Sequence, residues 1–569
     1  MPDPNYLTEI EREDGTVLTI RDAAAQQQLA GMNPVLQQIL AGVNDIKNGI
    51  GDTKSIIDAI LTGELPTSGV RFLDYDGSVV ATYSAKEFAA LESLPENPTH
   101  AGLTAQGWNW SLADAKTYVA AYGALDIGQM YVTDDGKTRL YITLPEGRTS
   151  PILQLYLNTN SELDIDWGDG STHSTFTSTT ADYKNERHEY SVSGDYVIAI
   201  TVTTGGFVLQ SSSTVVSSIL WNGDNASSSP DRAYNNAIKK VEVSADVASI
   251  GNYAFNGCYS LSSIIIPDGV TTIGDSAFNG CYLLLSITIP DTVTSIGQQA
   301  FYNCYSLSSI IIPDGVTTIG RYAFSGCYSL SSITIPDTVT SIGQQAFYNC
   351  YSLSSITIPD SVTSISSSTF SGCYSLLSIT IGDRVRTISD DAFSSCYSLS
   401  SITIPDSVTS IGNSVFSGCR SLSSIIIPDG VTTIGSYAFS GCSSLSSITI
   451  PDTVTSFGMN AFSGCYSLSS ITIPDTVRSI GQGAFNACYS LSSITTPDSV
   501  TSIGPSAFQN CSYMSFIKFE STTPPTVSNS NAWTGVSTST KILVPTGTLE
   551  AYQTATNYPN PSTYTYEEY

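Results

Sequence analysis

The chain has 569 residues, which predicts several folded units, because typical domains hold roughly 100 to 200 residues. It is acidic, with a formal net charge of −28 and 22 Lys and Arg residues, which argues against nucleic acids and anionic membranes as partners. No apolar run is long enough to insert as a membrane-spanning helix, and abundant Ser, Thr, Tyr and Ile favour β structure.

Residues 1–33 are predicted to be an attachment segment. They lack the basic and apolar stretches of a secretory leader, so we expect the protein not to leave the cell by the ordinary secretory route. The stretch EIEREDGTVLTIRDAAAQQQL resembles the Asp-Gly-Thr…Ile-x-Asp-Ala region near the start of tail-fibre and baseplate-associated proteins of phages and prophages of Firmicutes. That resemblance implies attachment to tail or baseplate proteins.

Residues 34–66 carry a heptad pattern of apolar side chains. The seam positions alternate in steps of three and four: Leu36, Ile39, Val43, Ile46, Ile50, Thr53, Ile57 and Ile60. Isoleucine at both seam positions favours three or more strands, so we predict a coiled-coil stalk that forms a homotrimer. Interior glycines weaken the helix by about 1 kcal/mol each. A single amphipathic helix that packs on its own domain is the alternative.

Residues 67–136 are predicted to form a small α+β module. VRFLDYDGSVVATY indicates a hairpin that turns at Asp76-Gly77, and SAKEFAALESL indicates a capped helix. Trp108 and Trp110 are expected in the core of this module. Residues 70–119 also resemble a module of the same phage-type proteins.

Residues 137–237 are predicted to hold a β-sandwich and a linker. The Asp-Gly of LDIDWGDGST suits a tight turn, and Tyr196, Ile198, Ile200 and Val202 share one parity, as in a half-buried strand. Trp-Gly-Asp-Gly at 167–170 and His-x-Tyr at 188–190 resemble the polycystic-kidney-disease (PKD) type of immunoglobulin-like sandwich. The resemblance implies a spacer or an extracellular interaction module.

The cysteines reveal a repeat. All 12 recur at a spacing of 23 residues, from Cys258 to Cys511, and columns of Phe and Leu keep the same step. In the unit LSSITIPDSVTSIGNSVFSGC, at 399–419, Leu-x-x-Ile-x-Ile predicts a strand and Pro-Asp a turn. Val-x-x-Ile-Gly predicts a second inward-facing stretch, and the closing segment predicts one helical or 3₁₀ turn. Stacked coils bury what one coil cannot, so residues 238–520 are predicted to form a solenoid.

This unit resembles the BspA-like, or Treponema pallidum-type, leucine-rich repeats. The resemblance implies a curved solenoid with an adhesion or interaction role and without enzymatic activity. Residues 521–569 are expected to cap the last coil with strands and a short helix. The predicted fold class is mainly β: a 23-residue leucine-rich-repeat solenoid preceded by an N-terminal coiled-coil helix, a small α+β module and an immunoglobulin-like (PKD) β-sandwich.

No arrangement of catalytic or metal-ligating residues stands out. The three histidines occur in no nucleophile-elbow, HExxH or Cys/His pattern, so we expect neither an enzyme nor a cofactor nor a metal site. Asp166 and Asp169 are expected to form turns, with calcium binding as the alternative. One cysteine per coil gives parallel side-chain directions, which favours a buried column of free thiols over disulfides.

Two residues before each Ala-Phe differ from coil to coil, whereas most positions are constant. We expect these variable pairs to face solvent, because a packed core would not accept such variety. Tyr, Asn, Asp and Arg are adaptable binding residues. The candidate ligand-binding residues in the variable pairs are Tyr253, Arg321, Tyr322, Asp390, Asp391, Tyr437 and Asn460.

A tyrosine column after the cysteines is a second candidate binding surface. Its members are Tyr259, Tyr282, Tyr305, Tyr328, Tyr351, Tyr374 and Tyr397. Arg420 and Ser443 interrupt the pattern before Tyr466 and Tyr489 resume it. Such a column would stack on glycans or peptides. The alternative is that the rings shield adjacent coils while free surface positions drift.

These features predict a receptor-binding protein of the phage or prophage tail-fibre type, located in the virion tail. Its solenoid would bind a bacterial cell-surface receptor, either a glycan or a protein, and three arms would add avidity. The alternative is a bacterial cell-surface BspA-like adhesin, with a leader missing from this sequence, that binds host or partner-cell proteins.

Overall fold

The computed structural model describes residues 9–11, 17–19, 69–73, 79–96, 103–108, 115–116, 119, 124–133, 135–212, 218–221 and 233–569. The seam of the predicted stalk lies outside the described residues, as do the Asp76-Gly77 turn and the side chains of Trp108 and Trp110, so these expectations stay predictions. The chain divides into two compact units, Met1–Glu96 with Trp110–Gly128, and Asn97–Asn109 with Gln129–Tyr569. No helix in the described ranges is long and apolar enough to cross a membrane.

The first unit contains the predicted hairpin and capped helix. β1 (Glu9–Glu11) pairs antiparallel with β2 (Val17–Thr19). β3 (Gly69–Leu73) pairs antiparallel with β4 (Val79–Tyr83) and parallel with the start of β6 (Ala124–Thr133). In the second unit, β5 (Leu103–Trp108) pairs antiparallel with the end of β6.

Helix α4 (Ala85–Ala89) begins with a capping box. The amide of Glu87 donates to the hydroxyl of Ser84, and the amide of Ser84 donates to the Glu87 carboxylate at 2.9 Å. This reciprocal pairing satisfies amides that the first helical turn leaves without partners. Phe88 is buried and its ring contacts that of Phe72. The predictions of a hairpin and of a capped helix are therefore confirmed.

The second unit contains a β-sandwich of two sheets. One sheet has the order β10 (Ser174–Ser178), β9 (Ser161–Asp166), β12 (Gly194–Thr204) and β7 (Lys137–Leu144). The other contains β11 (Asp182–Arg187), β8 (Ile152–Leu157), β13 (Phe207–Val208) and β14 (Leu220–Trp221). Residues along β7 alternate between buried and half-buried, as the two-residue period of a strand requires. Leu140, Leu153 and Ile198 are fully buried in the shared core.

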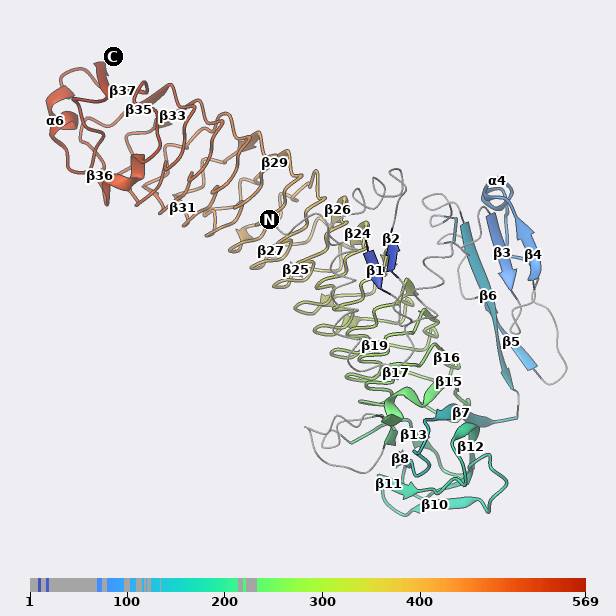
Figure 1. The fold of residues 1–569 in the computed structure, drawn as a ribbon. Helices are drawn as coiled ribbons and strands as arrows, with labels where there is room; N and C mark the ends of the chain where they lie inside the picture. The colour runs from blue at the N-terminus through green and yellow to red at the C-terminus, as the bar shows by residue number, and fades with distance from the viewer. Residues whose placement is uncertain are drawn as a thin grey trace. The chain divides into compact units, whose positions relative to one another are not determined.

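Both sheets of the sandwich continue into the solenoid (Figure 1). After a 3₁₀ turn, η2 (Ala233–Asn236), β15 (Ile238–Glu242) pairs antiparallel with β7 and parallel with β16 (Ser263–Ile265). From the other sheet, Leu209 forms a parallel bridge with Ile250, and Ile250 forms one with Ile273. One hydrophobic core joins the two parts. The sandwich thus covers the open end of the first coil. The PKD resemblance implied a spacer, and it did not predict this capping role.

In most coils, two sides are short parallel strands, paired in register with the residue 23 positions further on. Ser309 pairs with Ser332 on one side, and Thr318 pairs with Ser341 on the other. After β16, the Leu-x-x-Ile-x-Ile side contains β18 (Ser286–Ile287), β20 (Ser309–Ile311), β22 (Ser332–Thr334), β24 (Ser355–Ile358), β26 (Ser378–Ile381), β29 (Ser424–Ile426), β30 (Ser447–Thr449) and β33 (Ser493–Thr496).

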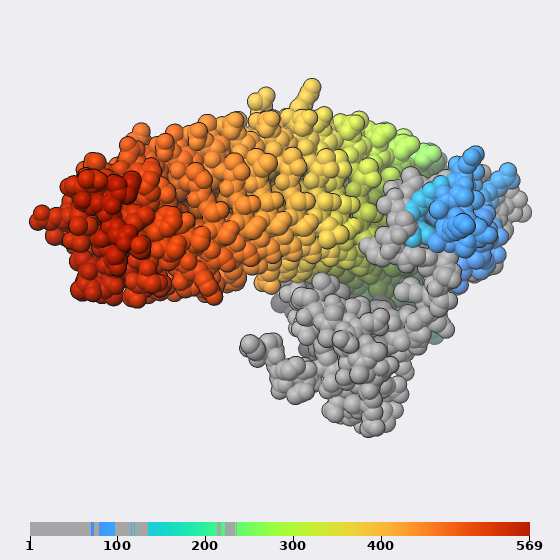
Figure 2. Space-filling view, turned by 90° about the horizontal axis from the view of Figure 1, so that it is seen from above, coloured from blue at the N-terminus to red at the C-terminus, as the bar shows by residue number. Residues whose placement is uncertain are grey.

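The Val-x-x-Ile-Gly side contains β17 (Thr272–Ile273), β19 (Ser295–Ile296), β21 (Thr318–Ile319), β23 (Ser341–Ile342), β25 (Ser364–Ile365), β27 (Thr387–Ile388), β28 (Ser410–Ile411), β31 (Ser456–Phe457), β32 (Ser479–Ile480) and β34 (Ser502–Ile503). The coils follow one another without interruption along the solenoid (Figure 2). The prediction of a solenoid with inward-facing stretches on both sides is confirmed.

The third side of each coil runs from the variable pair to the residue after the cysteine, as in residues 321–328. The amide of Phe301 donates to the carbonyl of Ala323, and that of Asn303 to Ser325, both at 2.8 Å, so a third set of backbone hydrogen bonds joins the coils. Left-handed residues such as Tyr322 (φ 57°) and Gly326 (φ 77°) turn the chain here. Because they interrupt right-handed winding, the expected helical or 3₁₀ turn is wrong.

Phenylalanines and cysteines fill the interior behind the third side. Phe324 and Phe347 stack with ring centroids 5.5 Å apart. All 12 cysteines are free and buried, and the Sγ of Cys350 donates to the carbonyl of Phe324 at 3.2 Å. Burial raises the pKa of the Cys373 thiol to about 12. The predicted column of buried free thiols is therefore confirmed.

The native chain should resist thiol alkylation at pH 8. A buried thiol with a raised pKa is not the thiolate that iodoacetamide attacks, so mass spectrometry should find little modification until guanidinium unfolds the solenoid. All 12 cysteines should then react. Rapid labelling of several cysteines in the native chain would contradict the packing described.

The last coil is covered by the predicted cap. Its elements are β35 (Phe516–Phe519), β36 (Thr526–Val527), η3 (Ser530–Trp533), β37 (Lys541–Val544), α6 (Leu549–Thr554) and β38 (Thr565–Glu568). Trp533 extends the phenylalanine stack, with its ring 5.4 Å from that of Phe508, and its Nε1 donates to the carbonyl of Asn557 at 2.9 Å. The strands and the short helix expected after the repeats are confirmed.

Removing the sandwich should expose the first coil. A chain that begins at residue 238 leaves the edge of β15 without the partner strand β7, and such an edge associates with other chains. We expect light scattering to show self-association, and hydrogen exchange to show weak protection at residues 250–273. A matched chain that begins at residue 135 should stay well protected there. Equal protection at residues 250–273, with both chains monomeric, would refute the capping role.

Candidate binding surface

The third side carries both candidate binding surfaces, the variable pairs and the tyrosine column. The first residue of each variable pair is exposed or half-buried, as expected. The second is half-buried in most coils and exposed at Tyr437, but it is buried at Gly483 and at Ser276, which is only 3% exposed. The expectation that both residues of every pair face solvent is therefore wrong for Ser276 and Gly483.

The second residue of every variable pair has a left-handed backbone, with φ between 53° and 61°. Gly483 and Asn460 suit this conformation, because glycine has no Cβ and asparagine tolerates the region. Tyr253, Tyr322 and Tyr437 occupy it in other coils, where the conformation costs an ordinary residue about 1–2 kcal/mol. Bulky aromatic side chains are thus held in strained positions at the surface, and such strain gathers at functional sites.

Arg321 and Tyr322 form a preorganised pair within one coil. The Cζ of Arg321 lies 4.8 Å from the centroid of the Tyr322 ring, and its Nη2 donates to the Tyr322 hydroxyl at 3.1 Å. The ring of Tyr302 approaches that of Tyr322 edge-on, with centroids 6.2 Å apart. The pair therefore offers a positive charge and an aromatic ring in a held geometry.

Asp390 and Asp391 have a different part in the array. An oxygen of Asp390 accepts a hydrogen bond from the Asn413 amide at 2.7 Å, so this carboxylate links neighbouring coils. Burial, followed by the nearby charge of Asp390, raises the pKa of Asp391. Asp390 thus serves coil-to-coil bonding, and Asp391 has a hydrogen bond with Ser414 of the next coil.

The tyrosine column is a continuous stack of rings. The centroids of Tyr305 and Tyr328 are 4.6 Å apart, with an angle of 4° between the planes, and the column keeps this arrangement from Tyr259 to Tyr397. The Cζ of Arg420 lies 4.4 Å from the Tyr397 ring. Neighbouring rings cover the ring faces within this run, so stacking of the column on glycans or peptides stays a prediction that concerns its uncovered parts. Its edges and hydroxyls remain candidate contacts.

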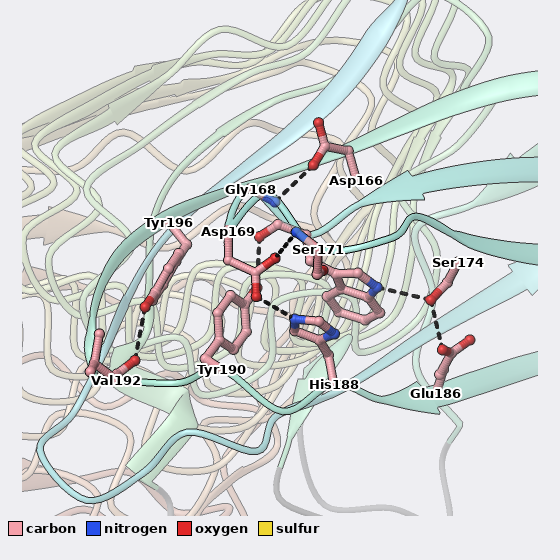
Figure 3. Close-up of polar contacts among 11 residues, drawn as sticks. Asp166, Gly168, Asp169, Ser171, Ser174, Glu186, His188, Tyr190, Val192 and Tyr196 are labelled. Atoms are coloured by element: carbon pink, nitrogen blue, oxygen red, sulfur yellow. Dashed lines mark hydrogen bonds and ion pairs between the residues drawn. The ribbon is translucent and has the colours of Figure 1, made fainter.

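In the sandwich, the two aspartates of the Trp-Gly-Asp-Gly region form turns, as expected (Figure 3). Asp166 accepts from the Gly168 amide at 2.9 Å, and Asp169 accepts from the Ser171 amide at 3.0 Å. Within the described ranges, no group of three or more His, Cys, Asp or Glu residues is placed to hold a metal ion.

His188 joins this turn to the sandwich core (Figure 3). Its ring stacks on Trp167 at 4.5 Å, and its Nε2 lies 2.8 Å from an oxygen of Asp169. The Tyr190 hydroxyl donates to the Trp167 carbonyl at 2.9 Å. Burial alone raises the pKa of Asp169, but hydrogen bonds from Ser171 and His188 outweigh it and lower the pKa to about 2.

Acid should weaken the sandwich through Asp169. Its folded pKa lies below the unfolded value of about 3.9, so its stabilising effect is present above that pH and is lost as the pH falls towards 2. Urea unfolding followed by tryptophan fluorescence should show a steeper loss between pH 4 and pH 2 than in Asp169→Asn. Asp182→Asn, an exposed control, should behave as the parent does. Identical pH profiles for parent and Asp169→Asn would contradict this assignment.

A family model described as "BspA type Leucine rich repeat region (6 copies)" matches residues 230–354, 294–423 and 409–534. Together these ranges span more than half of the chain. The chain belongs to the BspA-type leucine-rich-repeat family. This membership confirms the resemblance that the repeat pattern indicated.

Several solved structures are similar to this BspA-type protein. A leucine-rich repeat protein from Bacteroides ovatus is 32% identical, and the match covers 58% of this chain and 94% of that one, with a TM-score of 0.49. A leucine-rich cell surface protein from Faecalibacterium prausnitzii is 30% identical, with 58% and 95% covered and a TM-score of 0.36. The T. pallidum leucine-rich repeat protein is 31% identical, with 32% and 78% covered and a TM-score of 0.27. No curated protein matches the chain significantly.

Sequence reasoning missed two features of this surface. It did not detect that the second residue of every variable pair has a left-handed backbone, although Gly483 and Asn460 at this position were a signal. We call these residues the left-handed column. It also treated Arg420 as an interruption of the tyrosines, whereas the guanidinium continues their stack. A planar cation after a run of tyrosines was the available clue.

Proposed function

We propose that this protein is a bacterial cell-surface adhesin that binds host or partner-cell proteins through the third side of its solenoid. Membership of the BspA-type family supports this proposal, as does the similarity to the F. prausnitzii cell surface protein. These relatives favour the adhesin over the tail fibre. The interpretation as a homotrimeric tail fibre depends on the N-terminal stalk, which lies outside the described residues.

The observation that carries the proposal is the set of tyrosines in strained left-handed positions. Glycine or asparagine tolerates this conformation at Gly483 and Asn460, whereas tyrosine occupies it at a cost. Tyrosine instead supplies a large, amphipathic contact surface with few rotatable bonds. Because one such residue recurs in several coils, a partner protein can make many modest contacts along the array.

We also propose that the sandwich is of the PKD type. The stacking of His188 on Trp167 and the Asp169–His188 contact support this assignment, because they join the residues on which the resemblance rests. In this protein the sandwich also serves as the first cap of the solenoid.

Location tests the adhesin proposal most simply. Antibody raised against the solenoid should label the envelope of intact source cells in immunogold microscopy. Permeabilised cells should show little additional label. Label confined to phage-tail particles would overturn the proposal and restore the tail-fibre interpretation.

Replacing the strained tyrosines should separate stability from binding. The triple variant Tyr253→Gly, Tyr322→Gly and Tyr437→Gly should unfold at higher denaturant, because each change relieves a left-handed conformation worth about 1 kcal/mol. Flow cytometry of the labelled full chain should show that the amount of this variant bound to partner cells falls at least tenfold.

The matched control replaces Ser368, Ser414 and Ser506, which have the same backbone conformation and small side chains, with glycine. This control should gain similar stability and keep its binding. Equal binding by the two triple variants would mean that the tyrosines make no contact.

A further inference from the structure

The tyrosine column has a break at Ser443. Tyrosine rings stack from Tyr259 to Tyr397, Arg420 covers the last ring, and stacking resumes between Tyr466 and Tyr489 at 5.2 Å. The coil that carries Ser443 is otherwise intact, because its cysteine, leucine and isoleucine positions are buried as in its neighbours. The break therefore changes the surface of this coil and leaves its buried core as in the neighbouring coils.

The residues on the two sides of the break each have a face available. Arg420 is exposed and lies 4.4 Å from the Tyr397 ring on one side. Tyr466 is 49% exposed, and in the part of the chain that the structure describes its ring stacks on Tyr489 alone. Both the guanidinium and the phenol are planar groups that stack.

The spacing of the break matches one planar ring. Successive coils place their rings 4.6 Å apart, and two such steps separate Arg420 from Tyr466. A ring above Ser443 would therefore lie one stacking distance from each. The Ser443 hydroxyl donates to the Arg420 carbonyl at 3.2 Å, so it is turned towards the backbone.

We propose that the break at Ser443 binds an aromatic side chain of a protein partner between Arg420 and Tyr466. A cation prefers the negative face of an aromatic ring, and a phenol stacks on that ring in an offset arrangement. A sugar presents C–H groups to Tyr466 but no π face to Arg420, so the pair favours an aromatic ring. This inference deepens the proposed adhesive function by naming the side-chain class that one coil recognises.

The test uses the full chain and a small probe, N-acetyl-L-tyrosinamide, observed by saturation-transfer NMR. N-acetyl-L-leucinamide and methyl glucoside serve as comparison probes. The tyrosine probe should bind the parent and Ser443→Ala. Ser443→Tyr, which restores the residue of the neighbouring coils, should abolish binding because its own ring fills the break.

Arg420→Ala and Tyr466→Ala should each lower the affinity for the tyrosine probe by about fivefold, since each removes one stacking partner at an exposed position. Unchanged probe binding in Ser443→Tyr, or in both alanine variants, would overturn the inference. Equal or stronger binding of leucinamide or methyl glucoside at the break would overturn it as well. Adhesion of the parent chain to partner cells is measured separately, so loss of this subsite leaves the adhesin proposal standing.

Discussion

The packing of each residue against the residue 23 positions away is the constraint on which the structure depends. Strand pairs such as Ser309 with Ser332, the stacked phenylalanines and the hydrogen bonds from cysteine thiols all require that register. A slip of one residue would turn apolar side chains outward along both strand sides. One coil has no stable core of its own, so each coil relies on its neighbours, and the ends need closure. The sandwich and the C-terminal elements provide that closure.

The same register organises the surface. Where identical aromatic residues recur, their rings stack on each other, as in the tyrosine column. The ring faces that a neighbour covers are then not available to a binding partner. We therefore expect a partner to bind at positions where the residue differs from one coil to the next. The variable pairs and the break at Ser443 are such positions, and both lie on the third side. Their chemistry changes from coil to coil while the core behind them stays constant.

Much of this architecture could be predicted because repetition amplifies weak patterns. The cysteine spacing defined the coil, the apolar columns indicated the two strand sides, and the strand and helix patterns that follow the repeats indicated the cap. The left-handed column escaped prediction, since Tyr, Ser, Gln and Asp occupy it and none of them by itself indicates a positive φ. The fusion of the sandwich to the first coil also escaped, because the bridge between Leu209 and Ile250 joins backbones and has no side-chain pattern. The stacking of the tyrosine rings also escaped prediction, because it depends on how the rings are oriented as well as on how far apart they lie along the chain.

Hydroxyl-radical footprinting of the full chain on partner cells tests the central claim most directly, because it reports which side chains become covered. The account predicts that oxidation of Tyr253, Tyr322 and Tyr437 falls on cell binding. Oxidation of exposed aliphatic residues on the Leu-x-x-Ile-x-Ile side, such as Ile426 and Leu377, should stay unchanged. Protection of those aliphatic residues, with the three tyrosines still fully reactive, would contradict a binding surface on the third side.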